Sequence, residues 1–218
     1  VKFIWTHDAF RVGEDGPTHE PVEQEAQIRL MEKLKNHSGK DSVRVFRPAD
    51  ADETTVCWKL AMENTATPTA LILSRQGIAK LPAGNDYEQA AKGAYIVEGS
   101  DENPDVILVA SGSEVSTLVS GCEALRKEGI KVRIVSAPSE GLFRTQNKEY
   151  QEAILPYGIK KFGMTAGLPV TLEGLVGIGP NSKIFGLSSF GFSAPYKVLD
   201  EKLGYTGENV YKQVKAFL

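Results

Sequence analysis

The stretch DVILVASGSEVSTLVSGCEALRKEGIKVRIVS, residues 105–136, contains the pattern that decides the fold. An apolar run (DVILVA) is followed by an amphipathic segment of helical length, residues 114–128, and then by a second apolar run rich in β-branched residues (KVRIVS). Two strands joined through a helix favour parallel pairing, because a parallel connection needs a long crossover. The stretch therefore predicts an α/β unit.

The same alternation extends in both directions from this stretch. We predict further strands in VKFIW, SVRVF, ALILS, AYIVEG and IKKFGM, and further helices over 21–36, 52–64 and 147–155. Residues 77–93 are rich in Gly, Pro, Asn and Lys and have no clear period, which is typical of a linker. The sequence thus predicts two consecutive three-layer α/β units with mainly parallel sheets, an incomplete one over 1–84 and a complete one over 85–218.

Two of the predicted helices have features that can be checked. In the helix over 21–36, the apolar residues Val22, Ala26, Leu30, Met31 and Leu34 fall near one stripe, which predicts a buried face. In the helix over 52–64, Asp50 and Glu53 have the spacing of a capping box. Both helices are interpreted as structural elements.

Composition excludes several classes of protein. The chain has 218 residues, of which 41% are hydrophobic and 24% charged, which is typical of a globular protein. Its formal net charge is −3, so the sequence does not indicate a basic surface that binds nucleic acid or a membrane. No apolar run approaches the roughly 20 residues that span a bilayer, and the first residues have neither the basic start nor the apolar stretch of a secretory signal, so we expect a cytoplasmic protein. Cys57 and Cys122 are interpreted as buried hydrophobes.

The predicted strand VKFIW begins at Val1, the first residue of the sequence. We therefore expect that sheet partners of this strand lie upstream of Val1.

The segment THDAFRVGEDGPTHEP, residues 6–21, follows the first predicted strand and holds two of the three histidines. Ligands bind at the carboxyl ends of parallel strands, and Gly13 and Gly16 allow a tightly folded loop, so His7, Asp15 and His19 can face one pocket. Imidazoles and carboxylates suit a polyhydroxylated substrate. The alternative is a solvated surface loop. No metal site is predicted, because the spacing of the two histidines matches no common ligand pattern.

Arg75 stands at an equivalent place, since the strand in ALILS leads directly into Ser-Arg-Gln. A guanidinium fixed there can bind phosphate oxygens through two parallel hydrogen bonds. An ordinary ion pair with a neighbouring acid is the alternative, and the residues alone leave both open.

The segments GEDGPTHEPVEQ, RPADADE, PTALILSRQ, PDVILVASGSEV and FGFSAPYKVLDEKLGYTGENV together resemble the transketolase family over essentially the whole chain. The resemblance covers the end of the pyrimidine-binding domain and the C-terminal domain. It implies an enzyme that transfers a two-carbon ketol unit from a ketose phosphate to an aldose phosphate with thiamine diphosphate and a divalent metal (Mg or Ca). It also implies sugar phosphate substrates, a homodimer, and the rest of the same enzyme as partner.

The resemblance assigns a role to each candidate residue. His19 matches a catalytic histidine close to the reacting carbons, His7 one that contacts the sugar phosphate, and Asp15 an aspartate that recognises a substrate hydroxyl. Arg75 matches the arginine that holds the phosphate, which favours phosphate binding over the ion pair. The residues that grip the cofactor are expected upstream of Val1, so we expect this chain alone to be inactive and to hold no cofactor tightly.

Two departures and three alternatives accompany the resemblance. Gly77-Ile78-Ala79 and Thr165-Ala166-Gly167 differ from the common family pattern and bear on loop conformation. The first alternative is a related thiamine enzyme, either deoxyxylulose-phosphate synthase or dihydroxyacetone synthase. The second is a non-catalytic dimerisation or regulatory module. The third is one subunit of a two-subunit transketolase. Glu14 and the intact Ser-Arg-Gln favour transketolase over deoxyxylulose-phosphate synthase.

Overall fold

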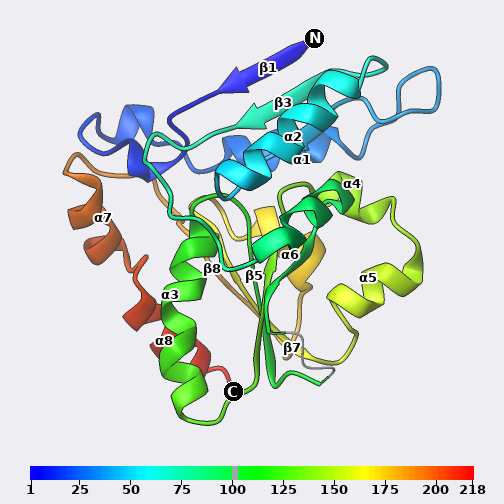
Figure 1. Cartoon of the computed structure of the whole chain (residues 1–218). Helices are drawn as coiled ribbons and strands as arrows, with labels where there is room; N and C mark the ends of the chain where they lie inside the picture. Colours follow the sequence, from blue (N-terminus) through cyan, green and yellow to red (C-terminus); the bar gives the residue numbers. More distant parts are fainter. Residues whose placement is uncertain (100–102) are drawn as a thin grey trace.

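The computed structural model describes residues 1–99 and 103–218, and it forms an α/β protein with two separate sheets (Figure 1). The first sheet has the order β1-β3-β2, with β1 at Lys2–Trp5, β3 at Thr69–Ile72 and β2 at Arg44–Phe46. Both strand pairs are parallel, with Lys2 and Arg44 each opposite Thr69. These three strands correspond to VKFIW, SVRVF and ALILS of the sequence.

The second sheet has the order β4-β6-β5-β7-β8. Its strands are β4 (Tyr95–Glu98), β6 (Val132–Ser136), β5 (Val106–Ala110), β7 (Lys160–Met164) and β8 (Ser182–Phe185). Only β4 runs antiparallel, against β6, and the other neighbours are parallel. The prediction of an α/β fold with mainly parallel sheets is therefore confirmed.

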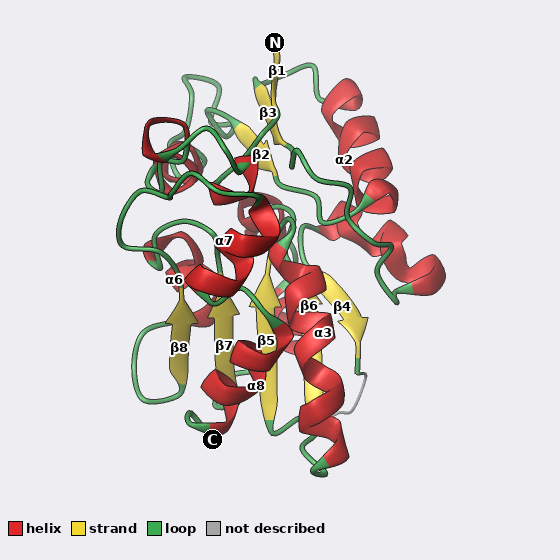
Figure 2. Ribbon diagram, turned by 90° about the vertical axis from the view of Figure 1, so that its left-hand side faces the viewer, coloured by secondary structure: helices red, strands yellow, loops and turns green. Residues whose placement is uncertain are grey.

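Helices cover both faces of the second sheet, with α3 and α8 on one side and α5 and α6 on the other (Figures 1 and 2). The helices are α1 (Gln24–Met31), α2 (Ala51–Glu63), α3 (Glu114–Lys127), α4 (Glu140–Arg144), α5 (Lys148–Ile154), α6 (Val170–Val176), α7 (Tyr196–Leu203) and α8 (Gly207–Lys215). Three 3-10 helices are η1 (Phe10–Val12), η2 (Pro17–His19) and η3 (Gly84–Lys92).

Strand β5 shows why DVILVA is apolar throughout. Val106 and Leu108 belong to the core cluster that contains residues of α3 and α8, whereas Ile107 and Val109 belong to the cluster that contains residues of α5 and α6. Alternate side chains point to opposite faces of a strand, and both faces are covered here, so every position is buried.

Helix α2 begins as its sequence predicts. The Asp50 carboxylate accepts a hydrogen bond from the Glu53 amide at 2.9 Å, and the Glu53 carboxylate accepts one from the Ala49 amide at 2.7 Å. In a regular capping box the Glu53 side chain would bond the amide of the cap residue, Asp50, but here it bonds the amide of Ala49, one residue earlier.

Cys57 in α2 and Cys122 in α3 are both buried, in agreement with their interpretation as small hydrophobes.

The prediction for the first helix is wrong in two respects. Helix α1 covers Gln24–Met31 and not 21–36, and Leu30, Met31 and Leu34 are exposed. The chain turns after α1, because the Asn36 side chain accepts hydrogen bonds from the Ser38 and Lys40 amides and its own amide donates to the Lys40 carbonyl. An asparagine that bonds the backbone ahead of it favours a turn over continued helix.

The predicted boundary between 1–84 and 85–218 falls inside η3 and stays a prediction.

In the described part of the chain, no helix has both the length and the apolar character needed to cross a membrane.

Candidate functional site

Three parallel strands end at the same edge of the first sheet and bring distant residues together there. Strand β1 leads into His7 and Asp8, β2 leads into Arg47, and β3 leads towards Arg75. The Asp8 amide donates a hydrogen bond to the Leu73 carbonyl and ties the first of these ends to the third. The candidate residues His7 and Arg75 thus follow the carboxyl ends of two of these strands, and Arg47, which was not a candidate, follows the third.

Residues 6–21, which we call the histidine loop, fold tightly through η1 and η2. Gly13 and Gly16 have positive φ angles of 100° and 81°, as expected for the glycines of this segment. His7 and Ala9 are the other residues of the loop with positive φ, at 65° and 56°. A left-handed backbone at a non-glycine residue costs energy and often marks a functional position.

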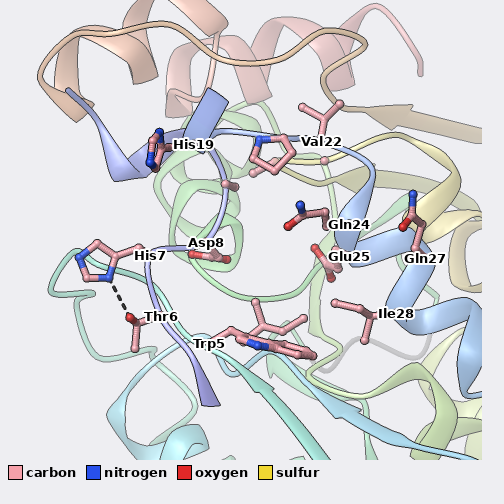
Figure 3. Close-up of a pocket in the computed structure, with 15 residues that line it drawn as sticks. Trp5, Thr6, His7, Asp8, His19, Val22, Gln24, Glu25, Gln27 and Ile28 are labelled. Atoms are coloured by element: carbon pink, nitrogen blue, oxygen red, sulfur yellow. Dashed lines mark hydrogen bonds between the residues drawn. The ribbon is translucent and has the colours of Figure 1, made fainter. Parts of the chain in front are cut away.

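His7 and His19 line the same cavity, which has a volume of about 510 Å³ (Figure 3). The cavity lies between the histidine loop, α1 and the loop at Ala166 and Gly167, and Trp5, Val22, Ile28 and Ile72 supply its apolar wall. Nδ1 of His19 lies 3.0 Å from the Thr18 hydroxyl and Nδ1 of His7 lies 2.8 Å from the Thr6 hydroxyl, so each ring has an orienting neighbour. Both side chains are exposed and open to a ligand.

Asp15 and Arg75 do not line this cavity. Asp15 lies exposed between Gly13 and η2. Arg75 is exposed too, and its Nη1 donates to the Val12 carbonyl at 2.7 Å, so that its guanidinium lies against the histidine loop. This bond uses one of the five N–H donors of the arginine. The four candidate residues thus share one loop region, with two in the cavity and two outside it.

A buried group of charges supports the loop, and the sequence analysis did not identify it. Arg47 is 1% exposed, and its guanidinium bonds the Asp8 carboxylate, with Nε to Oδ2 at 2.7 Å, and lies 3.6 Å from the Glu25 carboxylate. Burial raises the pKa of Asp8, and Arg47 opposes this shift. Burial also acts to raise the pKa of Glu25, but Arg47 and Arg29 outweigh it and lower that pKa.

Glu114, the first residue of α3, connects this group to the second sheet. Its fully buried carboxylate pairs with Arg47 through Oε2 and with Arg11 through Oε1, the latter at 3.1 Å. Arg11, within the histidine loop, also bonds the Ser113 hydroxyl at 2.6 Å and Asp200 of α7 at 2.7 Å. Two buried arginines of the first unit are therefore held by acids of the second.

Glu20 is the other buried acid of the histidine loop. Its side chain is fully buried and its Oε1 accepts a hydrogen bond from the Gly13 amide at 3.2 Å. Burial raises the pKa of Glu20 to about 7, although the bond from Gly13 opposes the shift. The only sequence signal for this residue was its place directly after His19.

The described residues include no cluster arranged to hold a metal ion, and the cavity beside His7 and His19 is not suited to a diphosphate. No group of three His, Cys, Asp or Glu side chains within 1–99 and 103–218 is arranged to hold a metal ion. The cavity beside His7 and His19 has no Lys or Arg among the described residues that line it, and its acids Asp8 and Glu25 face Arg47. A cavity with this lining suits a neutral, hydroxylated ligand better than a diphosphate.

Two family models match the chain. Residues 1–80 match the transketolase pyrimidine-binding domain, and residues 93–206 match the transketolase-like C-terminal domain. The second match alone covers more than half of the 218 residues.

Curated relatives and solved structures agree with these models. A transketolase of Staphylococcus aureus (strain MW2) is 42% identical over 215 residues, which are 97% of this chain and 31% of the relative. A mutant transketolase of Pichia stipitis shares the fold with a TM-score of 0.85 and 33% identity over 99% of this chain and 30% of that one. A transketolase from Leishmania mexicana gives a TM-score of 0.84 and 37% identity over 98% of this chain and 30% of that one. The chain spans about a third of the length of these proteins.

Proposed function

The chain belongs to the transketolase family, and from that premise we propose that it supplies the substrate-binding part of a longer enzyme that transfers a two-carbon ketol unit between sugar phosphates. Members of the family use thiamine diphosphate and a divalent metal. The observation that carries the proposal is the convergence of His7 and His19 on one cavity at the ends of parallel strands. The homodimer and the cytoplasmic location are part of the same proposal.

The proposed roles follow from position and chemistry. His19 exchanges protons or hydrogen bonds with the reacting part of the sugar, and His7 contacts the sugar phosphate. Asp15 accepts a hydrogen bond from a substrate hydroxyl, and Arg75 binds the terminal phosphate. The exposed side chains of Asp15 and Arg75 support these two roles, since both can meet a ligand that extends beyond the cavity.

The direct test is an assay of ketol transfer with the complete protein in the presence of thiamine diphosphate and Mg²⁺. Transfer from a ketose phosphate to an aldose phosphate supports the proposal, and its absence contradicts it. Transketolase and dihydroxyacetone synthase share the site residues that the resemblance assigns, so these residues do not distinguish the two enzymes. The preferred donor sugar does distinguish them.

This chain by itself is expected to bind thiamine diphosphate weakly, with no activity. Its cavity offers neither cations nor a metal-ligand group among the described residues, so a diphosphate gains little there. Isothermal titration with the cofactor, with and without Mg²⁺, measures this. Tight binding that depends on Mg²⁺ would show that the described cavity is not the whole cofactor site of the chain.

Replacing Arg75 with alanine in the complete enzyme is expected to raise KM for phosphorylated donors, with a smaller effect on kcat. The phosphate changes little during the reaction, so its binding energy is shared by ground state and transition state. Steady-state kinetics with phosphorylated and unphosphorylated donors test this. Equal impairment of both donor types would contradict the phosphate role and point instead to the bond between Arg75 and Val12.

A second candidate function is an interaction module, and the exposure of apolar side chains favours it. Phe3, Ile4 and Trp5 of the edge strand β1 are each more than 40% exposed, and so are Trp58 and Met62 of α2. Exposed apolar surface of this kind often marks a protein interface. Self-association of the purified chain in sedimentation experiments would support this function, which is compatible with the first.

A further inference from the structure

A segment of the second unit crosses the histidine loop and contacts it on both sides of the part that holds Asp15 and His19. This segment, residues 189–196, leads into α7, and we call it the C-terminal strap. In Figure 1 it runs beside the loop that follows β1, although more than 160 residues separate the two in sequence. Ser193, Ala194 and Gly191 make the contacts described next.

Three hydrogen bonds join the strap to the backbone of the loop. The Ala194 amide donates to the Gly13 carbonyl at 3.3 Å, and the Ser193 hydroxyl donates to the Glu14 carbonyl at 2.8 Å. The Gly191 amide donates to the Glu20 carbonyl at 3.1 Å. The bonds therefore fall at Gly13 and Glu14, just before Asp15, and at Glu20, just after His19, and none of them involves the side chain of Asp15 or His19.

Glu20 fills the space between the loop and the strap. Its Oε1 accepts from the Gly13 amide at 3.2 Å, which closes the loop on itself. A Cβ atom at position 191 would lie 1.8 Å from Oε2 of Glu20, so only glycine fits there without movement. A methyl group added at position 191 would therefore displace Glu20 or the strap, because a packed interior deforms little.

Arg75 holds the loop from the other side through its bond to the Val12 carbonyl. Residues 12–20 are thus fixed between a side chain that follows β3 and a strap that precedes α7. The histidine loop has four positive-φ residues, two of them within 12–20, and it needs such support to keep one conformation.

We propose that the C-terminal strap and Glu20 are a positioning device that sets where Asp15 and His19 meet the substrate. The proposal rests on the substrate roles given above and assigns a function to the second unit, namely to fix the shape of the histidine loop. Glu20 and Gly191 act through the loop and are positioning residues, since their contacts are with the backbone of the loop and of the strap and with each other.

The test uses the chain as it is and compares four variants by NMR. Gly191→Ala and Glu20→Ala break the contact between Glu20 and Gly191. Glu20→Gln keeps the size of the side chain and the oxygen that accepts a hydrogen bond from the Gly13 amide. Gly77→Ala is the matched control, because a Cβ atom there meets nothing within 4 Å. The three histidines give separate imidazole signals, and His37, in the turn at 36–40, is the internal reference.

We expect Gly191→Ala and Glu20→Ala to shift the His19 signal and to speed hydrogen exchange of the Gly13 amide by about tenfold or more, as for a local opening. The His37 signal and the amides of β5 and β7 should not change. Glu20→Gln and Gly77→Ala should resemble the parent chain.

Two results would overturn the proposal. One is a His19 signal and a Gly13 exchange rate in Gly191→Ala that match those of Gly77→Ala. The other is an equal loss of protection in the loop and in β5 and β7, which would make the contact an ordinary part of global stability. Neither readout uses a substrate, so a complete enzyme without ketol transfer would contradict the proposed function alone.

Discussion

Replacing Glu114 with alanine is expected to lower the free energy of unfolding by about 3–5 kcal/mol, the usual cost of removing one partner from a buried ion pair. The Glu114 carboxylate is fully buried and neutralises both Arg11 and Arg47. Without it, Arg47 keeps Asp8 and Glu25, but Arg11 keeps only Asp200 as a paired acid among the described residues. The carboxylate also lies at the first residue of α3, where the helix dipole favours negative charge.

Urea unfolding followed by circular dichroism measures this loss, and Glu123→Ala is its matched control. Glu123 lies in the same helix and pairs with Lys127, but its side chain is 78% exposed, so its removal should leave the free energy of unfolding almost unchanged. Glu114→Gln keeps the size of the side chain and should also destabilise, because it removes the charge. If Glu114→Ala were as stable as Glu123→Ala, the buried charges would not hold the two sheets together.

The sequence predicted the fold well wherever the period of apolar residues was regular. The run DVILVA, apolar at every position, correctly indicated a strand, whose two faces the structure shows to be covered, and the helix after Asp50 began at its predicted cap. The first helix failed because its apolar stripe continued past Met31, while Asn36 favoured a turn. Periodicity reports which residues could share a face, but it does not report where competing hydrogen bonds end a helix.

The candidate site was predicted from strand ends, and the same rule could have found more. Arg47 follows the strand in SVRVF and Glu114 follows the strand in DVILVA, just as Arg75 follows the strand in ALILS. Their pairing could not be read from the sequence, because it depends on how two sheets pack against each other. Glu20 and Gly191 give still less signal, since their contact joins segments about 170 residues apart.

Replacing His19 with alanine in the complete enzyme is expected to lower kcat by about 10²–10⁴-fold, the usual loss when acid–base or electrostatic help in the transition state is removed. His19 lines the cavity with His7, and the Thr18 hydroxyl 3.0 Å from its Nδ1 orients the ring. In the proposed role, hydrogen bonds from His19 to oxygens on the reacting carbons strengthen as charge develops, so the loss should fall on kcat more than on KM.

Steady-state kinetics with His37→Ala as the control separate this role from a structural one. His37 is exposed in the turn at 36–40 and does not line the cavity, so its removal should leave kcat unchanged. His19 is exposed as well, and neither substitution removes a core contact, so both variants should unfold at about the same urea concentration. A His19→Ala enzyme with normal stability and normal kcat would mean that the histidine loop only shapes the cavity and that the proton transfers depend on residues elsewhere.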